Sequence, residues 1–167
     1  TWEHQALTRA RFAAGDAATG VEFERIRNEI IARQRDWPKL RADVIEMRAR
    51  VAEGHPNRKA GELFDLKHDN GGLVDMEFAV QALVLRYGAV QPTMRADHGN
   101  IALAIRAGEL GLVTAEAGLA AANAYRALRS RQHAIRLQGA ERAAVPLTEL
   151  ADERSAIRSF YDAVMAP

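Results

Sequence analysis

Residues 64–81 hold the groups of this chain that could bind an anion. Lys67 ends a short run in which apolar and charged residues alternate, and Gly71 and Gly72 come just before a periodic apolar run. Backbone amides converge where a glycine turn meets a helix N-terminus, and a nearby ammonium group adds positive charge. We therefore expect this turn to be able to hold an anion. The plain alternative is a tight turn with no ligand.

Carboxylates surround the same turn, at Asp65, Asp69, Asp75 and Glu77. Asp75 and Glu77 fall in the first turns of the following helix, where acids interact favourably with unpaired N–H groups. They point in different directions because they lie two residues apart. The Asp-x-Asp pair that would hold two divalent cations occurs nowhere in the sequence. We expect no metal site, and we expect Asp65, Asp75 and Glu77 to orient the turn.

Other residue types offer little chemistry. None of the five histidines is spaced like the two ligands of a helical zinc site, and none of the three serines stands in a nucleophile-elbow sequence. The histidines are His4, His55, His68, His98 and His133, and the serines are Ser130, Ser155 and Ser159. Serine hydrolysis is therefore disfavoured.

Two places are rich in arginine. One expected helix carries Arg126, Arg129, Arg131, His133 and Arg136, and the first carries Arg9 and Arg11 behind a Trp-Glu-His-Gln run. A solvated helix face accounts for both. The sharper alternative is contact with a phosphorylated ligand or an acidic partner domain.

The elements that must position these residues are helices. The sequence is rich in alanine, leucine, arginine and glutamate, with 6% aromatic residues and five prolines, which favours an all-α protein. We expect a single helical-bundle domain spanning residues 1–167. It should be a compact bundle of six or seven helices, with one short extended segment before the central Gly-Gly turn.

Apolar spacing and caps predict the individual helices. The first runs from Thr1 to Ala14, and the second reaches about Arg33 with its buried face at Phe23, Ile26 and Ile30. Asp36 caps the third, which has Pro38 in its first turn, and residues 53–62 form a surface connection. The remaining helices are one from Leu73 through Tyr87 with a single buried stripe, one at Met94–Ala107, one from Thr114 to about Gln138, and one after Pro146.

Charge and cysteine content limit the function classes. The formal net charge of +1 calls for neither a nucleic acid nor a membrane surface. The chain has no cysteine, which is compatible with a reducing, cytoplasmic location. No signal peptide or membrane span is recognisable. The sequence opens at Thr1 without a methionine, so we expect a piece of a longer protein or a disordered start.

Several motifs in order resemble one family, that of the glutamine synthetase adenylyltransferases. They cover essentially the whole chain: Thr1-Trp2-Glu3-His4-Gln5-Ala6-Leu7, Arg9-Ala10-Arg11, Gly15-Asp16, Glu46-Met47-Arg48, Phe64-Asp65-Leu66-Lys67, Gly71-Gly72-Leu73, Asp75-Met76-Glu77-Phe78, Gln81, Leu83–Tyr87, Asn100, Ala124-Tyr125, Leu128-Arg129 and His133. Leu73 and Met76 stand where isoleucines are commoner, a volume-conserving change.

The resemblance implies a duplicated, bifunctional enzyme with two nucleotidyltransferase domains, each followed by a helical bundle. One half attaches AMP from ATP to a tyrosine of glutamine synthetase and the other removes it, under control of the PII signalling protein and glutamine. This chain is similar to the C-terminal bundle of the adenylylating half. The catalytic, Mg²⁺-binding carboxylates would precede Thr1, so we expect no catalytic residue and no cofactor held by this fragment alone, with Lys67, Gly71 and Gly72 facing the nucleotide cleft.

Two other functions stay open. The chain could be a non-catalytic module that docks glutamine synthetase or the PII protein, and an exposed apolar patch away from the turn, rimmed by arginines, would then be expected. It could also be the related bundle of a PII uridylyltransferase, which the opening motif and the chain end disfavour.

Overall fold

The structure is a computed structural model that describes residues 2–96 and 99–167, so that Thr1 and His98 lie outside it. Within these residues the chain forms seven α-helices, one 3₁₀ helix and two short strands. In chain order they are α1 (Trp2–Leu7), α2 (Ala17–Ile31), α3 (Trp37–Gly54), β1 (Leu63–Asp65), α4 (Leu73–Tyr87), η1 (Pro92–Met94), α5 (Asn100–Glu109), α6 (Ala115–Leu137), β2 (Ala144–Pro146) and α7 (Ala151–Val164). The predicted all-α class and helix number are confirmed.

Helix α4 lies at the centre of the molecule. It packs against α1, α3, α5, α6 and α7, and its Met76 and Leu83 side chains are fully buried. The sequence predicted a single buried stripe on this helix. Because helices surround it, α4 is instead buried on nearly every side, which explains why its residues are apolar almost throughout.

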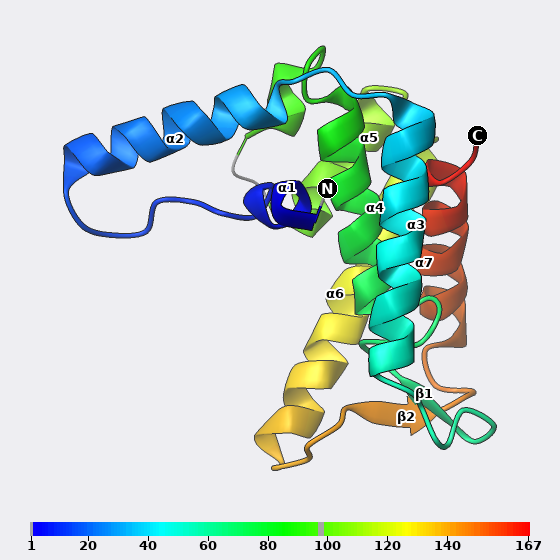
Figure 1. Cartoon of the computed structure of the whole chain (residues 1–167). Helices are drawn as coiled ribbons and strands as arrows, with labels where there is room; N and C mark the ends of the chain where they lie inside the picture. The colour runs from blue at the N-terminus through cyan, green and yellow to red at the C-terminus, as the bar shows by residue number, and fades with distance from the viewer. Residues whose placement is uncertain (1, 97–98) are drawn as a thin grey trace.

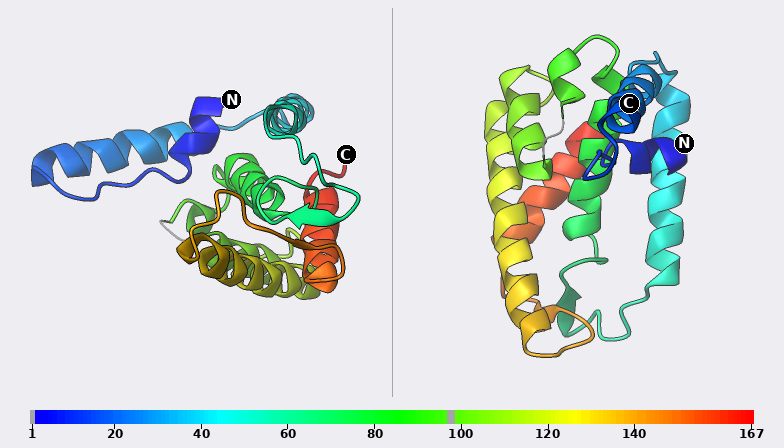
Figure 2. Two further views of the ribbon diagram at one scale, coloured as in Figure 1. Left: turned by 90° about the horizontal axis from the view of Figure 1, so that it is seen from below. Right: turned by 90° about the vertical axis from the view of Figure 1, so that its left-hand side faces the viewer.

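The other helices of the bundle enclose α4 from two sides. Figures 1 and 2 show α3 along one side of it and α5, α6 and α7 along the other. A Cβ atom added to Gly118 would lie 2.5 Å from the carbonyl oxygen of Ala104, so glycine lets α5 and α6 approach closely. The expected Thr114 cap is confirmed, since its Oγ1 accepts a hydrogen bond from the Ala117 amide at 3.1 Å.

A two-stranded antiparallel sheet closes one end of the bundle. Strand β1 is the extended segment that the sequence predicted, and its Phe64 lies opposite Val145 of β2. Both of these side chains are buried in the core. The sequence did not predict β2, whose Pro146 was expected only to separate two helices. The sheet fixes the chain on the N-terminal side of the glycine turn.

The first helix is shorter than predicted, because it ends at Leu7 and not at Ala14. The Arg27 guanidinium donates to the carbonyl oxygens of Leu7 at 3.2 Å and Thr8 at 3.1 Å. Because a side chain of α2 binds these two carbonyl oxygens, α1 ends at Leu7. Residues 8–16 then run out to the start of α2.

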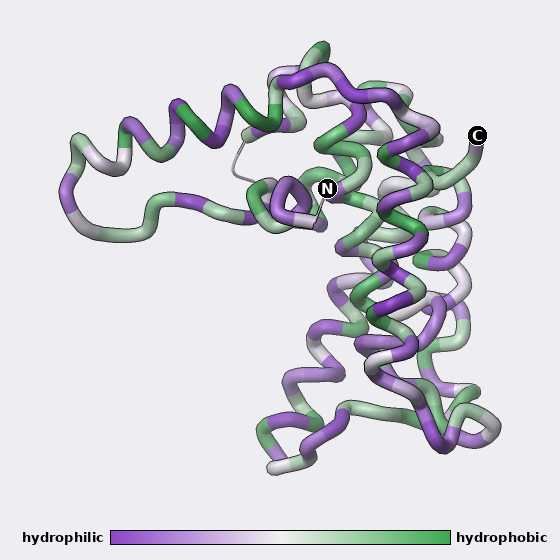
Figure 3. The backbone as a smooth tube through the Cα atoms, viewed as in Figure 1, coloured by the Kyte–Doolittle hydropathy of each residue, from purple (hydrophilic) through white to green (hydrophobic). Residues whose placement is uncertain are grey.

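Helix α2 projects from the bundle, at the end opposite the strands (Figures 1 and 2). Its predicted buried face is wrong at Ile26, which is 42% exposed, whereas Gly20, Arg27 and Ile31 are buried. The apolar spacing predicts packing of α2 on the core, but the main neighbour of α2 is the short α1. Hydrophobic and hydrophilic residues alternate along the projecting helix α2 (Figure 3).

Two further boundaries differ from expectation. The helix expected at Met94–Ala107 is divided, with η1 ending at Met94 and α5 beginning at Asn100. The last helix begins after Leu150, which has a left-handed φ of 58°. The third helix agrees with the sequence, since the Asp36 side chain caps it and Pro38 lies in its first turn.

Candidate functional site

The turn between β1 and α4 is held by its own carboxylates. One Asp65 carboxylate oxygen accepts hydrogen bonds from the amides of Lys67 at 2.9 Å and His68 at 3.0 Å. The Asp65 amide in turn donates to Asp69 Oδ2 at 2.8 Å. Asn57 also donates to Asp69 Oδ2, at 2.6 Å, which ties the preceding surface loop to the turn. The carboxylates at 65 and 69 thus shape the backbone from which Lys67 projects.

A buried ion pair fixes the other side of the turn. Arg48 of α3 pairs with Asp75 of α4, and the two side chains are only 7% and 3% exposed. Arg48 also donates to the His68 carbonyl oxygen at 2.8 Å, and Asp75 accepts from the Gly71 amide at 2.6 Å. Each charge therefore has a partner and further hydrogen bonds, as a buried pair requires. The pair connects the turn to two helices of the bundle.

The two glycines face inward. Gly71 has a φ of +83°, and a Cβ atom there would lie 2.5 Å from the Arg154 carbonyl oxygen of α7. The Gly72 amide donates to the Asp69 carbonyl oxygen at 2.8 Å. Both amides are thus engaged within the turn, and glycine is needed for the backbone path and the close approach to α7.

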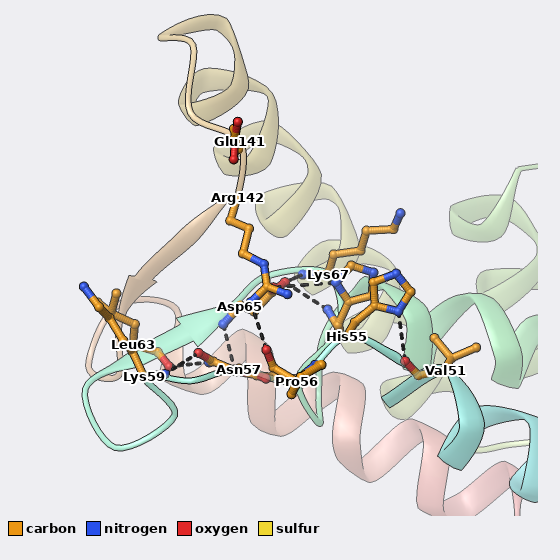
Figure 4. A network of polar contacts seen from close by, with 12 residues as sticks. Val51, His55, Pro56, Asn57, Lys59, Leu63, Asp65, Lys67, Glu141 and Arg142 are labelled. Atoms are coloured by element: carbon orange, nitrogen blue, oxygen red, sulfur yellow. Dashed lines mark hydrogen bonds and ion pairs between the residues drawn. The ribbon is translucent and has the colours of Figure 1, made fainter. Parts of the chain in front are cut away.

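Lys67 is exposed at the turn. In the described part of the chain no carboxylate pairs with its ammonium group, and in Figure 4 its side chain extends away from the network of hydrogen bonds. It lines a pocket of about 450 Å³ together with side chains from α6 and from the segment between α6 and β2. From that segment Arg142 reaches across to donate to the Pro56 carbonyl oxygen at 3.0 Å (Figure 4).

His68 lines this pocket and stacks on His55. The rings of His55 and His68 are 4.1 Å apart between centroids and nearly parallel. Burial lowers the pKa of His68, although the Asp65 carboxylate acts in the opposite direction. His68 is therefore neutral at pH 7 and adds no charge of its own to the pocket.

Glu77 lies on another face of α4, away from the glycine turn. Its carboxylate accepts a hydrogen bond at 3.0 Å from the Tyr125 hydroxyl, which itself accepts one from Asn100 at 3.0 Å. Burial, reinforced by the negative charge of Glu77, raises the pKa of Tyr125 to about 12. Glu77 thus joins α4 to α5 and α6.

The sequence prediction grouped these residues more tightly than the fold does. Asp65, Lys67, Gly71, Gly72 and Asp75 do meet in one turn, whereas Glu77 does not join them. The role of Arg48 was missed. The available signal was its spacing, four residues after the buried Val44 and eight after the buried Leu40, because a charged residue on an apolar helix face needs a buried partner.

Residues 2–96 and 99–167 contain no cluster of three histidines or carboxylates arranged to hold a metal ion. In the same residues no helix combines the length and the apolar character needed to cross a bilayer.

The fold and this turn define an all-helical domain with a rigid glycine turn and an adjoining basic pocket. Comparison with known proteins then shows to which family the chain belongs. The family model described as GlnD PII-uridylyltransferase matches residues 45–156, about two thirds of the chain. The chain belongs to this family.

Curated relatives that bear the name bifunctional glutamine synthetase adenylyltransferase/adenylyl-removing enzyme match nearly the whole chain. The protein of Bordetella bronchiseptica is 51% identical over 164 residues, which are 98% of this chain and 17% of that protein. The protein of Burkholderia mallei is 47% identical over 96% of this chain, again 17% of its own length. The resemblance drawn from the motifs is confirmed, and the chain spans about a sixth of the length of these relatives.

Proposed function

We propose that this chain is a helical domain of a cytoplasmic, bifunctional enzyme that adenylylates and deadenylylates glutamine synthetase and so regulates nitrogen assimilation. The names of relatives that match 96–98% of the chain carry this proposal. In the intact protein AMP would pass from ATP to a tyrosine of glutamine synthetase. The domain would pack against its own nucleotidyltransferase domain and complete the cleft. We expect the fragment alone to be inactive.

The nucleotide-facing residue in this proposal is Lys67. Its ammonium group projects from a turn that Asp65 and the Arg48–Asp75 pair hold rigid, and it has no carboxylate partner in the described residues. A fixed, uncompensated cation suits contact with a phosphate group. Gly71 and Gly72 would serve the cleft by shaping this turn, because their amides are already engaged within it. Asp65 and Asp75 orient the turn, and Glu77 orients the helix that follows.

ATP and Mg²⁺ would belong to the intact enzyme. Magnesium would supply charge neutralisation on the transferring phosphoryl group. We assign none of its ligands to this chain, since the described residues lack a suitable cluster of carboxylates.

Steady-state kinetics of the full-length enzyme test the role of Lys67. Lys67→Ala should lower kcat/KM for ATP by about tenfold or more. Lys67→Arg keeps the positive charge and should retain part of the wild-type kcat/KM. Lys59→Ala is the matched control, because Lys59 is an exposed lysine on the loop before β1. Adenylylation by Lys67→Ala at the normal rate, with an unchanged dependence on ATP, would remove Lys67 from the cleft.

A second candidate function is a docking module for glutamine synthetase or the PII signalling protein. The observation that favours it is the projecting arm of residues 8–31, where Phe12, Val21 and Ile26 are 38%, 73% and 42% exposed. Arginines of the same segment lie among them. Exposed apolar side chains on a projecting element suit a protein interface.

Calorimetric titration of this chain with each of the two proteins tests the docking function. Saturable binding that is lost in Val21→Asp supports it, and Leu137→Asp is the control because Leu137 is 88% exposed at the far end of α6. Absence of binding to both proteins would contradict the docking function, and the arm would then be expected to contact another part of the parent enzyme.

A further inference from the structure

The pocket beside Lys67 carries an unusual concentration of positive charge. Its volume is about 450 Å³, within the range of small-molecule sites. Four side chains with a full positive charge line it, one from position 67 and three from residues 129–142, which lie far from it in sequence. They are Lys67 of the turn, Arg129 and Arg136 of α6, and Arg142 of the segment before β2.

The acids of the pocket do not cancel this charge. Only two carboxylates, those of Asp65 and Glu141, line it among the described residues. Asp65 is buried and already accepts two amide hydrogen bonds from the turn. The formal charge of the lining is therefore +2 with the histidines neutral, counted as four cations less two carboxylates.

The hydrogen bonds made by the arginines leave their charges uncompensated. Arg136 donates to the backbone carbonyl of Glu141, and Arg142 donates to that of Pro56. Arg129 pairs with no carboxylate in the described residues. In contrast, Arg131 on the same helix is paired with Glu149 at 2.5 Å. The arginines that line the pocket thus differ from their neighbour outside it.

Two effects oppose anion binding at this pocket. The C-terminal end of α6 carries only about half a negative elementary charge, spread over its last carbonyl groups. Exposed cations on a flat surface are weakly attractive because solvent screens them. Here they converge on a concavity whose wall includes the buried Asp65 and Ala143, and this focuses the field.

We propose that this pocket binds an oligophosphate, the phosphate chain of a nucleotide or the free inorganic anion, held by Lys67, Arg129, Arg136 and Arg142. Two or more linked phosphates match four cations better than a single phosphate does, and one guanidinium group can bind two phosphate oxygens at once. The inference deepens the proposed function, because it rests on Lys67 facing a nucleotide and adds the α6 arginines that would hold the phosphate chain.

Calorimetric titration of this chain with inorganic tripolyphosphate tests the pocket without requiring enzyme activity. We expect one saturable site, weakened about tenfold by Arg129→Gln and by Arg136→Gln. Arg126→Gln is the matched control, because Arg126 is an exposed arginine of α6 outside the pocket. Circular dichroism of each variant ensures that lost binding does not come from lost folding, and Arg129→Gln carries the test if Arg136→Gln fails to fold.

Parallel titrations identify the source of the phosphate chain. Tighter binding of ATP than of tripolyphosphate would assign the pocket to a nucleotide, and equal binding would assign it to the phosphate chain alone. No saturable binding of either anion, or equal weakening by Arg126→Gln, would overturn the inference. The placement of Lys67 at the nucleotide cleft fails separately, if Lys67→Ala leaves catalysis by the full-length enzyme unchanged.

Discussion

At the scale of single residues, Arg48 and Asp75 are the groups on which the glycine turn depends. Both charges are buried, and each also makes a hydrogen bond to the turn backbone. Removing one partner leaves the other charge buried without compensation. Loss of either side chain should therefore disturb the turn more than loss of any exposed ion pair.

A double-mutant cycle measures this dependence. Arg48→Ala and Asp75→Asn should each lower the free energy of unfolding by about 3–5 kcal/mol, and the double variant by clearly less than their sum. Arg50→Ala breaks the exposed Arg50–Glu46 pair of the same helix, whose side chains are 65% and 62% exposed, and should cost at most about 1 kcal/mol. Urea denaturation gives all of these values. Additive effects of the two buried substitutions would contradict direct pairing.

Tyr125 gives the molecule a predictable response to alkaline pH. Its pKa is about 12 in the folded state and its ordinary value is 10.0. Because the folded pKa is the higher one, the contribution of Tyr125 to stability is complete below pH 10 and is lost as the pH rises towards 12. Burial also raises the pKa of Tyr161, so absorbance at the phenolate band should show more than one tyrosine titrating late, and Tyr125→Phe should remove the late step near pH 12. A tyrosine at 125 that titrates near pH 10 would mean that its hydroxyl is open to solvent.

At the scale of elements, the β1–α4 turn needs glycine at position 71 for two separate reasons. The φ of +83° is strained for other residues, and a Cβ atom would meet the backbone of α7. Gly71→Ala should lower the free energy of unfolding by about 2 kcal/mol or more. Gly61→Ala is the control, since a Cβ there meets no atom within 4 Å and its φ lies outside the strained range. Equal thermal unfolding midpoints of both variants would show that α7 shifts to accommodate the added Cβ atom.

Some elements could be predicted from the sequence and others could not. The glycine turn, the central helix and the caps at Asp36 and Thr114 follow from local signals, so they could be predicted. The end of α1 could not, because Arg27 of another helix determines it. Strand β2 is three residues long and exists only by pairing with β1. Contacts between distant segments decide such features, and one sequence does not display them.

The candidate site was predictable to the same degree. Local patterns placed Lys67, Asp65 and Gly71 in one turn, and the turn chemistry of those residue types is short-range. The pocket depends instead on α6 ending beside the turn, so its arginines could be noticed but not assigned to a cavity. The pairing of Arg48 with Asp75 could not be predicted for the same reason, because it depends on how α3 packs on α4.

At the scale of the whole molecule, stability and recognition are divided between two regions. The buried side chains concentrate around α4, where α3, α5, α6 and α7 pack on it. The arm of residues 8–31 joins this core only at its base, where Ile31 is buried and Arg27 donates to the carbonyl oxygens of Leu7, Thr8 and Arg95. Such a division lets surface residues of the arm change without cost to folding.

Two isoleucines of α2, Ile31 and Ile26, test that division with the same substitution. Ile31 is fully buried where α2 meets the bundle, so Ile31→Ala should lower the free energy of unfolding by about 2–5 kcal/mol. Ile26 is 42% exposed, and Ile26→Ala should change it by no more than about 0.5 kcal/mol, because alanine also favours a helix. Urea denaturation of both variants gives the comparison. A large loss from Ile26→Ala would mean that the arm folds back onto the bundle, and its exposed face would then not be available to a partner.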